Sequence, residues 1–429
     1  MSPLSRRIRL GTRVLLLPLA IAAAFGTSAQ VAPLGSDLPS LLEYARSHNP
    51  ELAAMQREAD AAAQRIQPAG ALPDPVLRVE LENINNFENG GNFSLLPSKV
   101  GETKYTLMQQ LPFSGKRELR RAAASADANQ AQARAAATWA EQAMKLRTAF
   151  AQYYLASHSE RITRDLLDLV VRLEQVAQTR YAGGLAPQQD AIRAQLAQTA
   201  MRAELIGLSK EKRQLQARMN ALLGRAPGST LADPVALPPV PAEGALNQSV
   251  LLERARANNL NVRTETARLQ AAQANRDLTV RNRYPDFNVG LSPTQMGSRI
   301  TTWGIMVELN IPLQQDTRRS QESEAAAMVE AARSRAEAAA IQAAADVEEQ
   351  LSALEAARRN ESLIGTRRLP QSQLVLQSAI AAYETGKVDF ATLMDAQRET
   401  GTARLDLLKA QVEAQLRIAE IERTLGEPL

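Results

Sequence analysis

The chain has 429 residues, enough for two or three ordinary domains, and 45% of them are hydrophobic although only 4% are aromatic. Much of the apolar content is alanine, which suits long, closely packed helices better than a globular core. The net charge is +4 with both signs mixed along the chain, which argues against a nucleic-acid partner, and the absence of cysteine excludes disulfides, thiolate metal sites and a lipid-modified N-terminal cysteine.

Residues 1–29 have the pattern of a secretory signal peptide. Four arginines precede an apolar run from Val14 to Phe25, and small residues at 27–29 follow it. This run is too short to cross a bilayer as a helix, which takes roughly 20 residues. We therefore predict an exported mature chain without a transmembrane helix.

The next segment predicts a helix followed by a pair of strands. The helix is expected from Leu38 to about Ala69, with a break at Asn49-Pro50. Alternating apolar residues predict strands at 76–83 and 104–111. The intervening residues 83–100 are rich in Asn, Gly, Ser and Pro, which is typical of a loop.

A long helical hairpin is expected after these strands. Residues 116–180 contain neither proline nor glycine, and a helix of that length would extend on the order of 100 Å. Its later part has apolar residues at heptad spacing, typical of a coiled coil. Gly183-Gly184 would turn the chain into a second helix that begins near Pro187 and runs to about Leu223.

The chain then repeats this plan after a proline-rich linker at residues 226–245. Five landmarks of the first half recur in order in the second: 41–52 with 251–262, Pro73-Asp74 with Pro285-Asp286, 111–113 with 311–313, 181–184 with 383–386, and 223–224 with 425–426. We therefore predict a tandem duplication. The first repeat is 30–225, with a β-hairpin at 76–111 and a helical hairpin at 116–223. The second is 246–429, with a β-hairpin at 286–311 and a helical hairpin at 317–425.

The second repeat differs from the first in detail. Its β-hairpin loop, expected at residues 293–299, is shorter. Its long helix, expected from about Thr317 to Tyr383, contains Gly365 and Pro370, so we expect a kink there.

Residues 301–312 alternate strictly between apolar and polar or small side chains. The apolar positions are Trp303, Ile305, Val307, Leu309 and Ile311. Such a strand can cover a soluble core or line a membrane β-barrel, and the rest of the chain offers no globular core for it to cover. Four strands cannot close a barrel, because the smallest membrane barrels have about eight. A membrane wall would therefore be shared between protomers, and a trimer would supply twelve strands.

At this point the sequence resembles the outer-membrane factors of tripartite efflux pumps, the family typified by TolC. The resemblance covers essentially the whole mature chain. It is most specific in RYAGGLAPQQDAIRAQ at 180–195 and AYETGKVDFATLMDAQRE at 382–399. The segment LPFSGKR at 111–117 resembles the heavy-metal branch, whose members serve resistance-nodulation-division (RND) exporters such as the Czc and Cus systems.

The resemblance implies a mainly α fold with a small β part. Three copies would form a homotrimer with a twelve-strand barrel in the Gram-negative outer membrane and a helical tunnel in the periplasm. The implied partners are a periplasmic adaptor, an inner-membrane RND transporter and outer-membrane lipid.

The resemblance also implies roles for particular residues. The adaptor would meet the periplasmic tip at Tyr181, Gly184, Leu185, Asp190, Tyr383, Gly386 and Lys387. A glycine is also common wherever a helix simply ends, so the two readings of Gly184 and Gly386 are compatible. The family carries acidic gate residues six and nine positions after the second glycine, which are Thr392 and Asp395 here. Asp395 fits this pattern or is a solvated surface aspartate, and Thr392 departs from it. Trp303, Ile305, Val307 and Leu309 would face lipid.

The leading hypothesis is a passive exit duct for heavy-metal cations and not an enzyme. The sequence contains no nucleophile–base pair, phosphate loop or metal-ligand spacing, so no cofactor is expected. A duct of the same fold for organic compounds or for protein secretion is the alternative. A periplasmic coiled-coil adaptor is a third hypothesis, against which the duplicated strand pairs argue.

Overall fold

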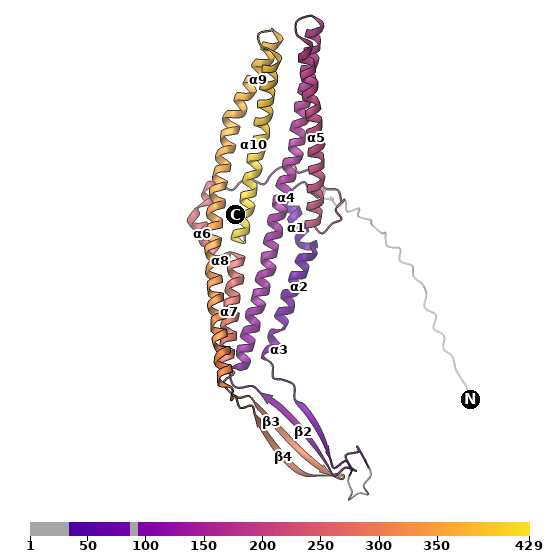
Figure 1. Cartoon of the computed structure of the whole chain (residues 1–429), viewed down its shortest axis with the longest axis vertical. Coiled ribbons are helices and arrows are strands. Elements are labelled where there is room, and N and C mark those ends of the chain that lie inside the picture. Colours follow the sequence, from indigo (N-terminus) through magenta and orange to yellow (C-terminus); the bar gives the residue numbers. More distant parts are fainter. Residues whose placement is uncertain (1–33, 86–92) are drawn as a thin grey trace, which may run out of the picture. The chain divides into compact units, whose positions relative to one another are not determined.

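The structure is a computed structural model that describes residues 34–85 and 93–429 (Figure 1). The predicted signal peptide and residues 86–92 of the predicted loop lie outside the described residues. The unit from Leu34 to Leu429 contains every element discussed below.

The first half of this unit consists of a broken helix, two strands and a long helical hairpin. Asn49 separates the first two helices, and its side chain accepts hydrogen bonds from the backbone N–H groups of Glu51 and Leu52, which caps the second helix at the predicted break. The elements are α1 (Leu38–His48), α2 (Pro50–Gln64), α3 (Ile66–Gly70), β1 (Val76–Glu82), β2 (Glu102–Leu111), α4 (Lys116–Ala182) and α5 (Gln188–Leu222).

The second half contains the same sequence of elements. Asn259 caps α7 in the way that Asn49 caps α2, by accepting from Asn261 and Val262. The elements are η2 (Glu243–Leu246), α6 (Gln248–Asn258), α7 (Leu260–Arg281), β3 (Phe287–Met296), β4 (Arg299–Leu309), α8 (Gln315–Leu363), η3 (Ile364–Arg368), α9 (Leu369–Glu384) and α10 (Phe390–Leu425).

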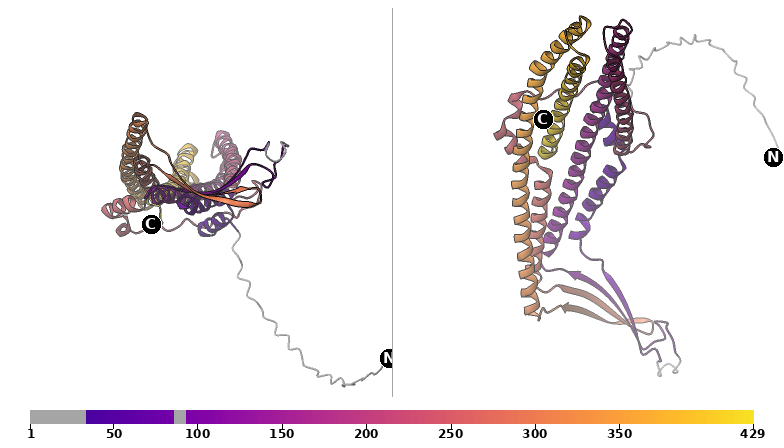
Figure 2. Two further views of the ribbon diagram at one scale, coloured as in Figure 1. Left: turned by 90° about the horizontal axis from the view of Figure 1, so that it is seen from below. Right: turned by 45° about the horizontal axis from the view of Figure 1, so that its top comes forward.

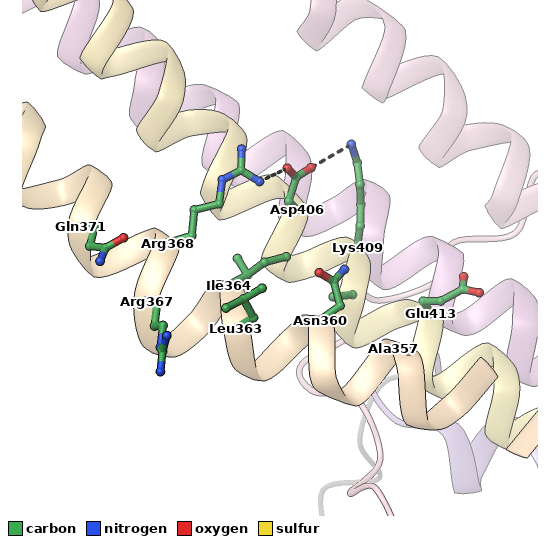
Figure 3. Close-up of a pocket in the computed structure, with 11 residues that line it drawn as sticks. Ala357, Asn360, Leu363, Ile364, Arg367, Arg368, Gln371, Asp406, Lys409 and Glu413 are labelled. Atoms are coloured by element: carbon green, nitrogen blue, oxygen red, sulfur yellow. Dashed lines mark hydrogen bonds and ion pairs between the residues drawn. The ribbon is translucent and has the colours of Figure 1, made fainter. Parts of the chain in front are cut away.

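At the position where the sequence predicts a kink, near Gly365 and Pro370, the structure has the π-helical segment η3 between α8 and α9. Proline has no N–H to donate to the preceding turn, which favours a local change of helix type. A groove of about 740 Å³ lies beside this segment, between it and α10 (Figure 3). Arg368 crosses from η3 to α10 and pairs with Asp406 at 2.9 Å and with Glu399 at 3.1 Å, which ties the irregular segment to its neighbour.

The four strands form one antiparallel sheet in the order β1-β2-β3-β4. The two β-hairpins of the repeats are therefore joined through β2 and β3. Among the described residues, β1 and β4 each have a neighbouring strand on one side only. In Figure 1 the strands lie beyond the end of the helices where α3 and the start of α4 are found.

The turn between β3 and β4 is shorter than the sequence suggests. The loop expected at 293–299 is wrong in its bounds, because only Gly297 and Ser298 separate the two strands. Gly297 has a φ of 61°, which allows a tight hairpin turn, so both strands continue past the expected ends. Pro293 lies inside β3 opposite Trp303, one residue before an irregularity in the register.

One face of the sheet is apolar and exposed. A row of opposed side chains crosses all four strands: Leu77, Leu107, Leu291 and Ile305. Ile305 is 80% exposed, and Trp303, Val307 and Leu309 on the same strand are exposed as well. The strand periodicity thus places the four predicted lipid-facing side chains on one surface.

Helix α4 is the central element of the helical part. It packs against α5, α7, α10 and α2, and Figures 1 and 2 show it between the helices of the two halves. The fully buried Leu41, Phe150 and Met219 belong to one core around its middle, and Leu251, Leu354 and Ile421 belong to a second between α6, α8 and α10. In the part of the chain that the structure describes, no helix is both long and apolar enough to cross a membrane.

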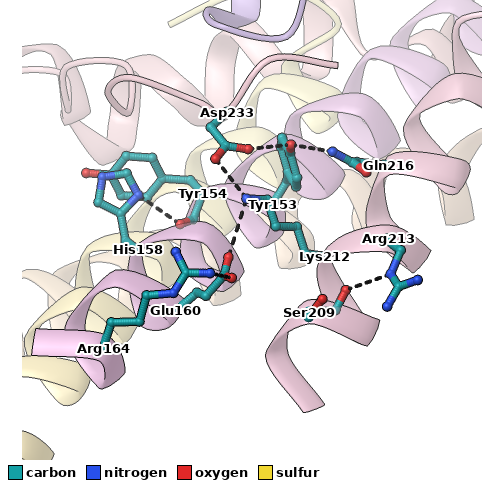
Figure 4. A network of polar contacts seen from close by, with 10 residues as sticks. All are labelled: Tyr153, Tyr154, His158, Glu160, Arg164, Ser209, Lys212, Arg213, Gln216 and Asp233. Atoms are coloured by element: carbon teal, nitrogen blue, oxygen red, sulfur yellow. Dashed lines mark hydrogen bonds and ion pairs between the residues drawn. The ribbon is translucent and has the colours of Figure 1, made fainter. Parts of the chain in front are cut away.

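Asp233 attaches the proline-rich linker to the first helical hairpin (Figure 4). It accepts hydrogen bonds from the hydroxyl of the fully buried Tyr153 and from Lys212 Nζ, both at 2.8 Å. Gln216 donates to the Tyr153 hydroxyl at 2.8 Å. Burial and the adjacent carboxylate raise the pKa of Tyr153 above its usual range, so this hydroxyl remains a donor to Asp233.

A buried lysine joins the sheet to the helices. Lys116, at the start of α4, is 3% exposed and donates to the Tyr284 carbonyl and to Asp286 Oδ1, both at 2.8 Å. The same carboxylate oxygen accepts from the backbone N–H of Phe113 at 2.9 Å. The Phe113 and Tyr284 rings stack with centroids 4.5 Å apart. The segment LPFSGKR therefore anchors the turn before β3.

This junction predicts a loss of stability in acid. Burial would raise the pKa of Asp286, but the hydrogen bonds from Lys116 and Phe113 and the charge of Lys116 outweigh it and hold that pKa below its ordinary value of 3.8. A depressed pKa contributes stability above the unfolded value, and this is lost as pH falls below about 3.8 towards the folded value. Thermal melts followed by circular dichroism should show that the melting temperature falls less steeply below pH 4 in Asp286→Asn than in the parent. An equal acid slope in both proteins would contradict this assignment.

Candidate functional site

The two turns that end the helical hairpins have the same backbone geometry. In the first, the Leu185 N–H donates to the Arg180 carbonyl at 2.8 Å across Gly184, whose φ is 69°. In the second, the Lys387 N–H donates to the Ala382 carbonyl at 2.8 Å across Gly386, whose φ is 75°. Both glycines thus occupy the left-handed position of a helix C-terminus, where a side chain would be strained.

The helix that returns from the second turn has a side-chain cap. Asp389 accepts from the Thr392 N–H at 2.8 Å and from the Thr392 hydroxyl at 2.6 Å. These two hydrogen bonds lower the pKa of Asp389, so it remains ionised at the positive end of the helix dipole. Thr392, the position that departs from the acidic family pattern, has this capping role in the structure.

Side chains from both hairpins meet at the tip. The Tyr383 hydroxyl of α9 donates to Asp190 Oδ2 of α5 at 3.1 Å, although the residues are far apart in sequence. Arg180 of α4 lies over the Tyr383 ring at 5.2 Å from its centroid and donates to the Glu384 carbonyl at 2.6 Å. Phe390 packs edge-on against that ring, with centroids 5.2 Å apart. We call Arg180, Asp190, Tyr383 and Phe390 the tip cluster.

The tip cluster divides the predicted tip residues into two groups. Asp190 is 7% exposed and Tyr383 is 3% exposed, so both face the inside of the chain. Tyr181, Leu185 and Lys387 are exposed around the two glycines. Asp190 and Tyr383 therefore position the turns, and the exposed residues form the outer surface.

The surroundings of Tyr383 in the tip cluster stabilise its neutral, protonated form. Burial, together with the charge of Asp190, raises the pKa of Tyr383 to about 12. The hydroxyl thus remains a donor at every physiological pH. Asp190 accepts this bond in a buried setting, where losing a partner costs about 1–3 kcal/mol.

We expect Tyr383→Phe to loosen the tip without unfolding the chain. Removal of the hydroxyl leaves the buried Asp190 carboxylate without its donor, so amides at residues 180–190 should exchange hydrogen roughly tenfold faster or more. Tyr181→Phe is the matched control, because Tyr181 occupies the same position in the first repeat and is exposed. Equal protection in the two variants would show that the Asp190–Tyr383 hydrogen bond does not hold the tip.

The structure places the predicted gate residue Asp395 on the exposed surface of α10. Its carboxylate is 3.2 Å from Arg398 Nη1, one turn further along the helix, and both side chains are well exposed. Exposed pairs of this kind contribute little stability in water. The fold of the single chain therefore does not depend on the charge of Asp395.

Two participants in the tip were missed by sequence reasoning. Arg180 precedes Tyr181 in the motif, yet nothing in the repeat points to it, because Ala382 occupies the same position in the second half. Phe390 starts α10 and corresponds to no aromatic residue in the first turn. The sequence signal that could have identified Arg180 and Phe390 is that each is a cationic or aromatic residue present in only one of the two repeats.

The described residues contain no group of three or more acidic or histidine side chains placed to hold a metal ion. The site geometry is that of two glycine turns held together from inside, with an exposed rim.

A model of the family described as "Outer membrane efflux protein" matches residues 41–225 and again residues 251–427. The chain belongs to the outer membrane efflux protein family. It is also similar to the cobalt-zinc-cadmium resistance protein CzcC of Cupriavidus metallidurans, with 24% identity over 437 aligned positions that cover 96% of this chain and all of that protein.

Solved structures of outer-membrane channels share the fold. The channel OprN has a TM-score of 0.75 at 21% identity and covers 91% of this chain and 89% of its own. VceC from Vibrio cholerae has a TM-score of 0.75 at 16% identity, with 91% and 96% covered. As a family member, the chain is an outer-membrane efflux channel component and not an enzyme. Efflux systems of this family imply adaptor and inner-membrane transporter partners.

Proposed function

We propose that this chain is the outer-membrane exit duct of a metal-efflux pump, with cobalt, zinc and cadmium cations as cargo. The observation that carries the proposal is the full-length similarity to CzcC, whose name gives those three metals. The absence of a metal cluster in the described residues is compatible with it, since a duct can pass an ion without binding it.

The working assembly is a homotrimer in contact with outer-membrane lipid. The exposed apolar face of the sheet supports the lipid contact, because isolated apolar patches of this kind normally mark an interface. The single-sided strands β1 and β4 support association, because open sheet edges are not tolerated in lipid. Three copies would bring twelve strands together. We expect no lipid-modified N-terminal cysteine, because the sequence contains no cysteine.

The tip is the adaptor-binding surface in this proposal. Tyr181, Leu185 and Lys387 supply apolar and cationic contacts, and the bare backbone at Gly184 and Gly386 allows a partner helix to approach closely. Asp395 supplies the gate charge, since three copies around an axis would form an acidic ring that favours cations. Thr392 adds no charge to this ring.

The test is accumulation in a strain that lacks the gene. Cells are loaded with cobalt, zinc, cadmium, nickel or copper, and separately with a fluorescent organic dye, and cell-associated metal and dye are measured. We expect cobalt, zinc and cadmium to rise and to return to parental levels when the gene is restored. A rise of dye alone would overturn the metal assignment in favour of an organic-compound duct.

A fractionation measurement separates the duct from a periplasmic adaptor. A barrel wall in lipid requires detergent for extraction, whereas an adaptor without a lipid anchor is released by salt or alkali. We expect release by detergent only. Release by alkali would contradict a membrane-embedded duct.

A further inference from the structure

The internal duplication of this chain can be checked strand by strand. The landmark pairs align Asp74 with Asp286, just before the first strand of each hairpin, and Leu111 with Ile311, at or just after the end of the second strand. The same two offsets in residue number, one for each pair of strands and called the shifts below, align Val76 with Asn288 and Met108 with Glu308. Val76 lies opposite Met108 in β1–β2, and Asn288 lies opposite Glu308 in β3–β4. The structure thus reproduces the alignment residue by residue.

One contact of the sheet has no counterpart inside the chain. Strand β2 of the first repeat pairs with β3 of the second, and this is where the Lys116–Asp286 junction lies. The equivalent contact would pair β4 of the second repeat with β1 of a first repeat. In the described residues these two strands are the free edges of the sheet, so the described part of the chain supplies no partner for either.

The residues at that missing contact are exposed in the single chain. By the shifts above, the stacked pair Phe113 and Tyr284 corresponds to Leu313 and Leu72. Leu313 is 80% exposed and Leu72 is 42% exposed. Asp74, the counterpart of Asp286, is exposed as well. Two leucines and a carboxylate are thus available where the internal junction has an aromatic stack and a carboxylate.

We propose that a second copy of this chain completes the junction. Leu313 of one copy packs on Leu72 of the next, and its backbone N–H donates to Asp74, as Phe113 does to Asp286. This inference rests on the homotrimer of the proposed function and deepens it by assigning the residues and the register of the contact.

The register follows from β2–β3. Met108 lies opposite Gly290 there, and the shifts convert this pair into Glu308 opposite Arg78 of the next copy. Opposite charges directly across an antiparallel pair are favourable. Arg78 also has Glu80 of its own strand at 3.7 Å, so it would lie between two carboxylates.

The apolar face also continues across the contact in this register. Inside the chain, Leu107 lies opposite Leu291, and the shifts convert this pair into Val307 opposite Val79 of the next copy. In the same way, the pair Leu111 and Phe287 is converted into Ile311 opposite Pro75 of the next copy. A slip by one residue would bring these side chains to the opposite face of the sheet. The charge pair and the apolar rows therefore agree on one register.

One part of the internal junction is not repeated. The position that corresponds to Lys116 is Asp316, which is fully solvated and 3.5 Å from Arg319. The contact between copies therefore has no buried lysine, and Asp74 takes its partner from the backbone. The internal junction of the chain is electrostatically the stronger of the two.

The absence of native cysteine allows a direct test by cross-linking. The variant Arg78→Cys/Glu308→Cys is purified in detergent, oxidised and run on a non-reducing gel. Opposed residues of an antiparallel pair have Cα atoms about 4.5–5.5 Å apart, within the range that a disulfide bridges. We expect covalent dimers and trimers. Leu77→Cys/Leu309→Cys tests the same register if the first variant does not fold.

Two controls isolate the register. Met108→Cys/Gly290→Cys is the equivalent pair inside the chain and should form an internal disulfide, seen as loss of free thiol without cross-linked oligomers. Arg78→Cys/Asn310→Cys is shifted by two residues, about 6.7 Å along the strand, and should cross-link roughly tenfold less.

The mass of the parent protein in detergent, measured by light scattering, distinguishes failure of the proposed register from failure of the proposed homotrimer. A trimer in which the shifted pair cross-links best, or in which only the internal control cross-links, overturns the register and leaves the homotrimer standing. A monomer at every concentration overturns the homotrimer itself.

Discussion

Gly386→Val is expected to abolish efflux while leaving the protein in the outer membrane. A β-branched residue is strongly disfavoured at the φ of 75° found there, and strain of about 1–2 kcal/mol falls on a turn of a few residues. A Cβ at this position would also lie 3.3 Å from Arg180 Nη2, which belongs to the guanidinium that bonds the Glu384 carbonyl. The Arg180 guanidinium would have to move by a few tenths of an ångström, which weakens its link between the first hairpin and the second turn. Cell-associated cobalt, zinc and cadmium should rise to the level of the deletion strain.

Two matched glycines separate the causes. Gly184 has a φ of 69°, but a Cβ added there would meet nothing within 4 Å, so Gly184→Val has the strain without the close contact to Arg180 and should give an intermediate accumulation. Gly207 lies in α5 with open space around it, and Gly207→Val should leave efflux unchanged. Full efflux in Gly386→Val at normal protein levels would show that the tip geometry is not needed.

Lys116→Met should destabilise the folded protein more than any surface lysine change. Methionine retains most of the packing volume but removes the charge that Asp286 faces at 2.8 Å. Removing one partner of a buried ion pair costs about 3–5 kcal/mol, and the partial exposure of Asp286 reduces this to about 2–3 kcal/mol. The free energy of unfolding in urea, measured in detergent, should fall by that amount.

The control for this variant is an exposed lysine in a helix. Lys210 on α5 is exposed, and Lys210→Met should change the free energy of unfolding by less than about 0.5 kcal/mol. Asp286→Asn should weaken the same junction by a smaller amount, since the amide oxygen still accepts from Phe113. A change in Lys116→Met no larger than in Lys210→Met would refute the anchoring role.

The sequence by itself determined the features that depend on short-range periodicity. Alternation at Trp303, Ile305 and Val307 predicted the exposed apolar face, because strand side chains alternate by geometry alone. The absence of proline and glycine at residues 116–180 predicted one continuous helix, which the structure extends from Lys116 to Ala182. The glycines at 184 and 386 predicted the turns of the two helical hairpins. The duplication was visible for the same reason, because each landmark is a local motif.

The tertiary structure decided the contacts between segments far apart in the chain. Asp190 was expected on the tip surface, yet it bonds Tyr383 inside, because the facing of each long helix depends on how α4, α5, α9 and α10 pack together. The partner of Lys116 is likewise found 170 positions away, at Asp286. Local patterns define which face of an element is apolar, but the free energy that selects its neighbour comes from packing and desolvation across the whole fold.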